Sequence, residues 1–466
     1  MVIAKKVREE PVPLKKPVMH PNRDLQVISS MTGSMHPAEC LVCHASSGKS
    51  IREESMNVIR KIVVPALAAS LIATSYAGAW AENVKIGNIE PLSGPSASLG
   101  QQGKAAREMA VEEINAAGGI KSLGGAKLEL LFADSESKPE KGVAEAERLI
   151  NTEKVHVLTG CWNSAVTYPT TAVAERYGIP FVVPVSVADK ITEQGFKTVF
   201  RIAAKDSWWT RDQFTFLKDM QDEFGTKVEK LAFVYENGDW GKGFAGQWKE
   251  LAEKAGYQVV LDEPYPSTAT DLSPVVQKIR RAKPDVLMMV SNAADAILLT
   301  NTLAEYKVNL KAIITSGGGH ADPSFMKAAG KSAQYMFDIV EWETDVNKPG
   351  AKEANDKYKA KYGQNLTGEA VDAYVAMYVL KDALERAASL DPAKIREALA
   401  ATNLTSSPGL IVGYDAIKFD ATGQNENASL VMVQVNDTGN GLERITIWPK
   451  SARRAGYTPV FPMPNK

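Results

Sequence analysis

The chain has 466 residues, of which 54 are Lys or Arg and 55 are Asp or Glu, so its formal net charge is −1. This balance gives no electrostatic reason to expect nucleic acid or another polyanion as a partner. The apolar content of 44% and the presence of only three cysteines indicate a globular protein of two or three domains without a disulfide framework.

Residues 56–81 contain the three regions of a secretory signal peptide in order. Arg60 and Lys61 supply the positive charge, 62–73 is an uncharged and largely apolar run, and Ala79-Trp80-Ala81 is a small-x-small cleavage site. The apolar run is too short to span a bilayer comfortably. We therefore predict export and cleavage after Ala81.

Residues 1–55 precede this signal and show no sustained periodicity, so we interpret them as an artefactual or disordered leader, with translation starting at Met56. They include CLVCH (40–44), the pattern of covalent haem attachment. Haem is attached after export to the part of the chain that is kept, whereas CLVCH lies before the export signal. We therefore expect no haem and no other cofactor.

From Val84 onward, strands and helices alternate with short loops. Strands are expected at 84–91, 127–134, 155–160, 179–184 and 199–203, with helices at 102–117, 139–151 and 164–177 between them. Alternation of this kind predicts a doubly wound parallel sheet with helices on both faces.

A second series of the same kind follows. Strands are expected at 230–236, 257–263, 284–291, 311–317 and 335–342, with helices at 209–224, 240–255, 272–282 and 295–306. The rest of the chain is expected to form helices at 351–362, 368–389 and 392–402 and a final strand pair at 428–435 and 444–448.

The predicted fold class is therefore α/β, with two doubly wound lobes. We assign 82–203 and 340–412 to lobe 1, 204–339 and 413–450 to lobe 2, and 451–466 to a C-terminal tail. No low-complexity linker separates the lobes, and the chain passes between them more than once through extended segments. Such a multi-strand connection is typical of hinge closure.

Open α/β sheets bind ligands beyond the carboxyl ends of their strands, where helix N-termini present free N–H groups. The loop TGCWNSAVT (159–167) has the strongest signal, because Asn163 or Ser164 can begin the helix that follows and the N–H groups there suit a carboxylate. The alternative is that Ser164 is only a helix cap.

Tryptophans also gather near the predicted cleft. Trp162, Trp208 and Trp240 fall at strand ends or crossovers, as do Trp209 and Trp342. Their rings could stack on an apolar or aromatic solute, and the alternative is that they fill the space between the lobes.

The chain lacks the usual signatures of catalysis. GDWGKG (238–243) does not have the G-x-G-x-x-G order, no phosphate-loop lysine motif or G-x-S-x-G elbow occurs, and Cys161 has no evident His partner. Only His156 and His320 remain after residue 50, which disfavours a His-rich metal site. We predict a non-catalytic protein without a metal.

Five segments together carry a family resemblance: KIGNIEPLSGPSASLGQQGKAA, VEEINAAGGI, AERYGIPFV, FVYENGDWGKGFAGQW and KPDVLMM. The chain resembles the branched-chain amino-acid-binding family of periplasmic solute receptors, which have the type I binding-protein fold and serve ABC importers. The resemblance covers roughly the whole mature chain.

The resemblance implies roles for individual residues. In that family a serine at the start of the helix after the third strand holds the ligand carboxylate, which corresponds to Ser164. Groups after the fourth strand hold the rest of the ligand head, which corresponds to Val185, Ser186 and Val187. The aromatic residue ahead of the second-lobe glycines corresponds to Trp240.

The chain also departs from the family pattern. Val187 stands where the amino-acid binders carry a threonine, and Gly318 stands where they carry a glutamate for the ligand ammonium. A buried ammonium without a carboxylate is costly, so another acid would have to take its place. The candidates for that acid are Asp189, Asp295, Glu341 and Asp372.

The function implied is that of a monomeric periplasmic receptor. It would capture a small carboxylate-bearing solute, such as a branched-chain or other apolar amino acid, between its lobes and deliver it to an ABC permease in the inner membrane. The alternatives are a receptor for an aromatic acid or a small amide, and a sensory ligand-binding module.

Overall fold

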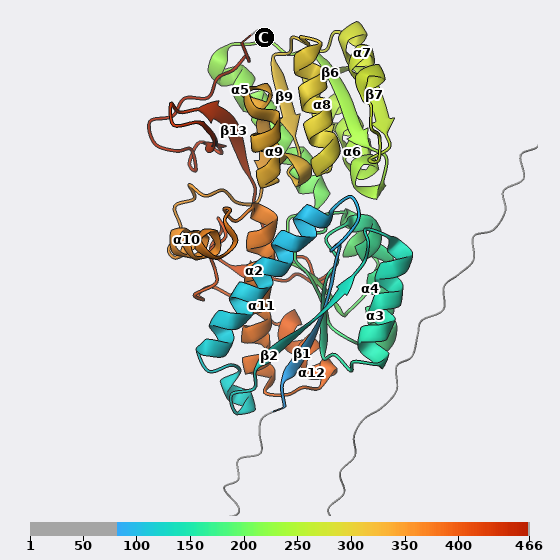
Figure 1. Cartoon of the computed structure of the whole chain (residues 1–466), viewed down its shortest axis with the longest axis vertical. Coiled ribbons are helices and arrows are strands. Elements are labelled where there is room, and N and C mark those ends of the chain that lie inside the picture. The colour runs from blue at the N-terminus through green and yellow to red at the C-terminus, as the bar shows by residue number, and fades with distance from the viewer. Residues whose placement is uncertain (1–81, 465–466) are drawn as a thin grey trace, which may run out of the picture. The chain divides into compact units, whose positions relative to one another are not determined.

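A computed structural model describes residues 82–464 (Figure 1). The predicted leader (1–55), the CLVCH motif within it and the predicted signal peptide (56–81) lie outside the described residues. Within the described residues, no helix combines the length and the apolar character needed to cross a membrane.

The first lobe is built on a five-stranded parallel sheet with the strand order β2-β1-β3-β4-β5. The helices α3 and α4 pack together on one face of the sheet, and α2 lies beside α11 on the other (Figure 1). The elements are β1 (Val84–Glu90), α2 (Ala97–Ala116), β2 (Leu128–Asp134), α3 (Pro139–Asn151), β3 (Val157–Gly160), α4 (Ser164–Tyr177), β4 (Phe181–Val183), β5 (Val199–Arg201) and α11 (Gly368–Ala387).

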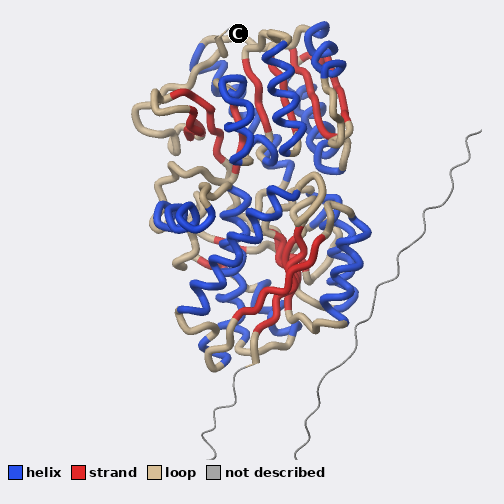
Figure 2. The backbone as a smooth tube through the Cα atoms, in the orientation of Figure 1, coloured by secondary structure: helices blue, strands red, loops and turns tan. Residues whose placement is uncertain are grey.

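The second lobe has a seven-stranded sheet with the order β14-β13-β10-β9-β8-β6-β7, whose strands are drawn in red in Figure 2. Five strands are parallel, and β13 and β14 pair antiparallel at one edge. The elements are α5 (Asp206–Phe224), β6 (Lys230–Glu236), α6 (Asp239–Ala255), β7 (Gln258–Tyr265), α7 (Ser273–Ala282), β8 (Val286–Val290), α8 (Ala293–Glu305), β9 (Ala312–Thr315), α9 (Pro323–Ala329), β10 (Phe337–Val340), β13 (Val431–Asp437) and β14 (Leu442–Trp448). The predicted fold class, two α/β lobes with doubly wound sheets, is confirmed.

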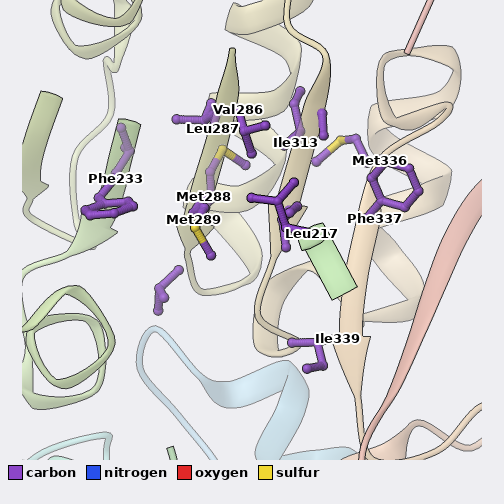
Figure 3. Close-up of a cluster of buried hydrophobic side chains, with 14 of the residues drawn as sticks. Leu217, Phe233, Val286, Leu287, Met288, Met289, Ile313, Met336, Phe337 and Ile339 are labelled. Atoms are coloured by element: carbon purple, nitrogen blue, oxygen red, sulfur yellow. The ribbon is translucent and has the colours of Figure 1, made fainter. Parts of the chain in front are cut away.

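The core of the second lobe shows why its strands read as continuous apolar runs. All five residues of β8, including Met288 and Met289, are buried. Leu217 of α5 and Phe337 of β10 belong to the same core, which is drawn in Figure 3. Because helices cover both faces of this sheet, neither face of a central strand meets water, and polar residues have no place there.

Three connections join the lobes. The first follows β5, the second follows β10, and the third leads from β12 to β13. The remaining elements are α10 (Ala351–Tyr362), α12 (Pro392–Ala400), β11 (Asn403–Leu404) and β12 (Ile417–Lys418). Gln424 ties the first and third connections together, since its side chain accepts a hydrogen bond from Arg201 at 2.6 Å and donates one to the Ala203 carbonyl at 2.9 Å.

The structure differs from the predicted division at two places. Tyr414, Ile417 and Phe419, which we placed in lobe 2, belong to the core that contains α2 and α11 of the first lobe. These side chains are apolar, and β12 pairs with β11, so the crossing to lobe 2 comes later than residue 413. The predicted C-terminal tail packs on the second lobe, where Phe461 and Met463 are buried in the core.

Candidate functional site

A cavity of about 220 Å³ lies between the two lobes. This is below the roughly 300–1,000 Å³ of pockets that hold drug-sized ligands, so the cavity suits a small solute. Its walls come from the segments that follow strand ends in both sheets, as expected for open α/β sheets. The lining residues of those segments are Pro95, Ser96 and Leu99 after β1, Trp162–Ala165 after β3, Val185–Val187 after β4, Glu236 at the end of β6 with Gly238, Asp239 and Trp240 after it, Ser316 and Gly318 after β9, and Glu341 after β10.

The N-terminus of α4 faces this cavity. Asn163 occupies the position before the helix, but its side chain makes no capping bond and instead donates to the Ser96 hydroxyl at 2.9 Å. Ser164, the first helical residue, is buried, and its hydroxyl oxygen accepts a bond from the Ala188 N–H at 3.3 Å. Ser164 is therefore not a helix cap. The N–H groups of Val166 and Thr167 already donate to the Asn163 carbonyl, at 3.0 and 2.9 Å, whereas those of Ser164 and Ala165 have no intrahelical acceptor. These two N–H groups and the Ser164 hydroxyl proton are available to an anion.

The loop after β4 forms the adjacent wall. Val185 packs with Leu99 and Trp162 in a small apolar cluster, and Val187 is buried beside the cavity. Ser186 donates its hydroxyl proton to the Trp162 carbonyl at 2.7 Å, so this side chain holds the two loops together.

Three tryptophans line the cavity. Two of them, Trp162 and Trp240, are among the predicted site residues, and the third is Trp209. Trp208, which we predicted in the site, is not among the lining residues. Trp209 is, and its buried indole N–H donates to the Ala204 carbonyl at 3.2 Å. The helix α5 begins at Asp206, earlier than expected, and consecutive positions on a helix point in directions about 100° apart.

Glycines make room for two of these rings. A Cβ atom on Gly103 would lie 2.6 Å from the ring of Trp162, and one on Gly318 would lie 2.5 Å from the ring of Trp240. Gly318 also has a φ of +53°, in the left-handed region that favours glycine. A larger residue at 318, including the glutamate implied by the family resemblance, would displace Trp240.

Four carboxyl groups line the cavity, and they differ in their partners. Glu236 accepts bonds of 2.7 Å from the N–H groups of Gly238 and Gly241, at the start of α6. Asp239 forms an ion pair of 2.9 Å with the exposed Lys190 of the first lobe. These two groups are therefore satisfied within the protein.

The other two carboxyl groups are Glu341, which follows β10, and Glu369, in the first turn of α11. Both are buried. Neither oxygen of Glu341 has a hydrogen-bond partner among the described residues, and burial together with the charges of Glu369 and Asp372 raises its pKa well above the ordinary 4.5. Sequence reasoning considered Glu341 but missed Glu369, because an acid in a helix carries no signal of burial.

The other acids considered as partners for a ligand amine do not line the cavity. Asp295 accepts from the Tyr265 hydroxyl at 2.7 Å and lies at the start of α8. Asp189 accepts from the Ser207 N–H at 3.2 Å. Asp372 is fully buried, and burial together with the charge of Glu369 raises its pKa.

Cys161 is not among the lining residues either, although Trp162 and Asn163, which follow it directly, are. Its thiol is buried, and burial raises its pKa well above the ordinary value, so the thiolate needed for nucleophilic chemistry is disfavoured. Among residues 82–464, no group of three or more His, Cys, Asp or Glu side chains is placed to hold a metal ion.

Hydrogen bonds connect the lobes around the cavity. Asp322 of the second lobe accepts from Ser98 at 2.7 Å and from Gln102 at 3.2 Å, both on α2 of the first. On the other side, the Gly318 N–H donates to Glu369 at 2.9 Å. The structure thus has the lobes in contact, with the cavity between them.

Comparison with known proteins agrees with this architecture. Residues 83–440 match the family model described as periplasmic binding protein. A Leu/Ile/Val-binding protein homologue from Brucella suis is 30% identical over 405 residues, which cover 84% of this chain and 97% of that protein.

Two solved structures share the fold. A leucine-binding protein from Thermotoga maritima has a TM-score of 0.68 at 23% identity, with 79% of this chain and 99% of that one covered. A solute-binding protein of an ABC transporter from Rhodopseudomonas palustris, in complex with 3,4-dihydroxybenzoic acid, has a TM-score of 0.68 at 20% identity, covering 78% and 96%. From the family match and the coverage of its relatives, the chain belongs to the periplasmic binding protein family.

Proposed function

We propose that the mature chain is a non-catalytic periplasmic receptor that captures an amino acid with an apolar or aromatic side chain and delivers it to an ABC permease. The observation that carries this proposal is the start of α4. The Ser164 hydroxyl and the free N–H groups of Ser164 and Ala165 face a small cavity between the two lobes. Together they suit the carboxylate of a small solute.

The side chain of the solute would contact the tryptophan rings that line the cavity. Trp162, Trp209 and Trp240 offer flat apolar surfaces that favour a branched or aromatic side chain. The relative from Brucella suis is named as a homologue of Leu/Ile/Val-binding proteins, which supports a branched-chain amino acid as the solute. The relative structure with a bound dihydroxybenzoic acid keeps an aromatic acid as the second candidate.

Isothermal titration of residues 82–466 against the twenty amino acids and a set of benzoates tests this proposal. We expect at least one to bind and the Ser164→Ala variant to lose about 1–3 kcal/mol of binding free energy, because a charge-assisted hydrogen bond in a dry cavity is removed. Ser273→Ala is the matched control, since Ser273 is the first residue of α7 and lies outside the cavity.

Unchanged affinity in Ser164→Ala would contradict the assigned carboxylate site. Absence of binding by every compound, or turnover of one into a product, would contradict the receptor function. Export is tested separately by N-terminal sequencing of the protein from the periplasmic fraction, where we expect Glu82 as the first residue. A cytoplasmic, uncleaved chain would refute that part of the proposal.

A further inference from the structure

Two carboxyl groups of the cavity have acceptor atoms that the protein leaves unused. Both oxygens of Glu341 and the Oε2 atom of Glu369 lack a hydrogen-bond partner among the described residues, and both side chains are buried. The remaining oxygen of Glu369 accepts from the Gly318 N–H at 2.9 Å. Buried acceptors in native proteins are normally satisfied, so these atoms indicate a missing donor.

The surrounding charges do not neutralise the two groups. The cavity lining contains no Lys or Arg. The guanidinium of Arg444, which acts electrostatically on Glu369, is held by Asp338 at 2.9 Å and by Glu343 at 2.7 Å. The neighbouring Asp372 is a further acid, and the buried Tyr414 hydroxyl, which accepts from Asn425 at 3.2 Å, is neutral, so neither supplies positive charge. The residues around the cavity therefore offer no free positive charge to Glu341 and Glu369.

An ionised carboxylate in a dry site is strongly disfavoured unless a cation or several donors reach it. In the unliganded protein a proton can serve, because adjacent carboxyl groups do not all ionise together. We propose that Glu341 and Glu369 form a subsite for the ammonium group of the captured solute, which replaces that proton with three N–H donors. This inference rests on the proposed receptor function and specifies an amine-bearing solute.

The position of Gly318 explains why the acid comes from elsewhere. The ring of Trp240 and the left-handed backbone leave no room for a side chain at 318. Glu369, on α11 of the first lobe, instead reaches across and bonds the N–H of this second-lobe residue. That bond can exist only while the lobes are in contact, so the same group that binds the amine also joins the lobes.

The test compares solutes that differ only in the amine. L-phenylalanine is titrated beside 3-phenylpropanoate, and L-leucine beside 4-methylpentanoate; any other amino acid that binds is compared with its own deaminated acid. We expect the amino acid to bind at least about 100-fold more tightly, since the deaminated acid leaves two buried carboxyl groups without donors. We also expect its affinity to rise from about pH 5 to about pH 8, because its binding releases a proton.

Two variants locate the effect. Glu341→Gln and Glu369→Gln should each weaken binding of the amino acid by roughly 10- to 100-fold and change binding of the deaminated acid by less than about threefold. Glu353→Gln, an exposed acid on α10, is the control and should behave as the wild type. A cooperative thermal transition in the unliganded variants, at or above the melting temperature of the wild type, confirms that they fold.

The possible failures are distinguishable. If the deaminated acids bind as tightly as the amino acids and Ser164→Ala weakens both, the receptor function stands and the ammonium subsite is refuted. Affinity for an amino acid that falls with rising pH also refutes the subsite. If none of these compounds binds, both proposals fail.

Discussion

The first lobe contains two sets of deeply buried acids, of which one is paired with a cation and the other is not. Glu90, at the end of β1, lies 2.5 Å from Arg107 of α2, and both side chains are fully buried, although the contact is an ion pair without a well-aligned hydrogen bond. Glu341, Glu369 and Asp372 are equally buried and have no comparable cation. The chain therefore supplies a positive charge where an acid supports the fold.

Burial outweighs the attraction even in the paired case. The pKa of Glu90 is raised to about 7, because the loss of solvent exceeds the stabilisation by Arg107. Without a cation, the acids beside the cavity are shifted in the same direction and for the same leading reason. The difference teaches that a missing counter-charge is informative only where a cavity gives a ligand access to the acid.

The largest expected effect comes from removing the counter-charge where it exists. Arg107→Met leaves Glu90 alone in the core and should lower the free energy of unfolding by about 3–5 kcal/mol. Guanidinium denaturation of residues 82–466 measures this, with Lys104→Met on the same helix as a partly exposed control expected to change stability by at most about 1 kcal/mol. A loss in Arg107→Met no greater than in the control would remove the distinction between the two sets of acids.

A smaller change of opposite sign is expected at the cavity. Glu341→Gln removes one of three adjacent carboxyl groups and should raise the stability of the unliganded protein by about 1–2 kcal/mol near neutral pH. The same denaturation experiment, without solute, measures it. A clear loss of stability would mean that Glu341 has a structural partner after all.

The pH dependence sharpens this contrast. A group whose pKa is raised in the folded state contributes its full stability below its ordinary value of 4.5 and loses it as the pH rises toward the folded value. The stability advantage of Glu341→Gln over the wild type should therefore grow from about pH 5 to about pH 8. Parallel curves for the two proteins over this range would show that Glu341 does not titrate there.

The smallest effect is expected where water screens the charges. Lys190 and Asp239 join the two lobes across 2.9 Å, but both are exposed. Lys190→Ala should change the free energy of unfolding by less than about 1 kcal/mol, and less still at high salt. A loss above about 2 kcal/mol, measured by the same denaturation experiment, would show that this surface pair holds the lobes together.

Much of the fold could be predicted from the periodicity of apolar residues and from the residues that start and end helices. The helices α3, α4 and α10 and the strand β6 have the predicted bounds. Helix α2 begins at Ala97, five residues before the expected Gln102. The prediction missed these first turns because they contain Ser and Gly, which have low helix propensity. The buried Leu99, packed against Trp162 and Val185, holds that turn in place.

The site was only partly predictable. Loops after strands were placed at the cavity because the topology of parallel sheets requires it, and seven of the eight named residues line it. Trp208 does not line the cavity, because the start of α5 decides which of two adjacent indoles faces inward. Glu369 was missed because nearly every side of α11 is buried, so its sequence gives no amphipathic pattern that would distinguish an inward acid from an exposed one.

The rings of Trp162 and Trp240 are each fixed against a glycine of their own lobe, on opposite sides of the gap. Separation of the lobes would leave both contacts intact and would change only what lies in front of each ring, from solute or protein to water. Indole emission responds to such a change in polarity. The protein therefore contains its own optical reporter of occupancy, which needs no attached dye.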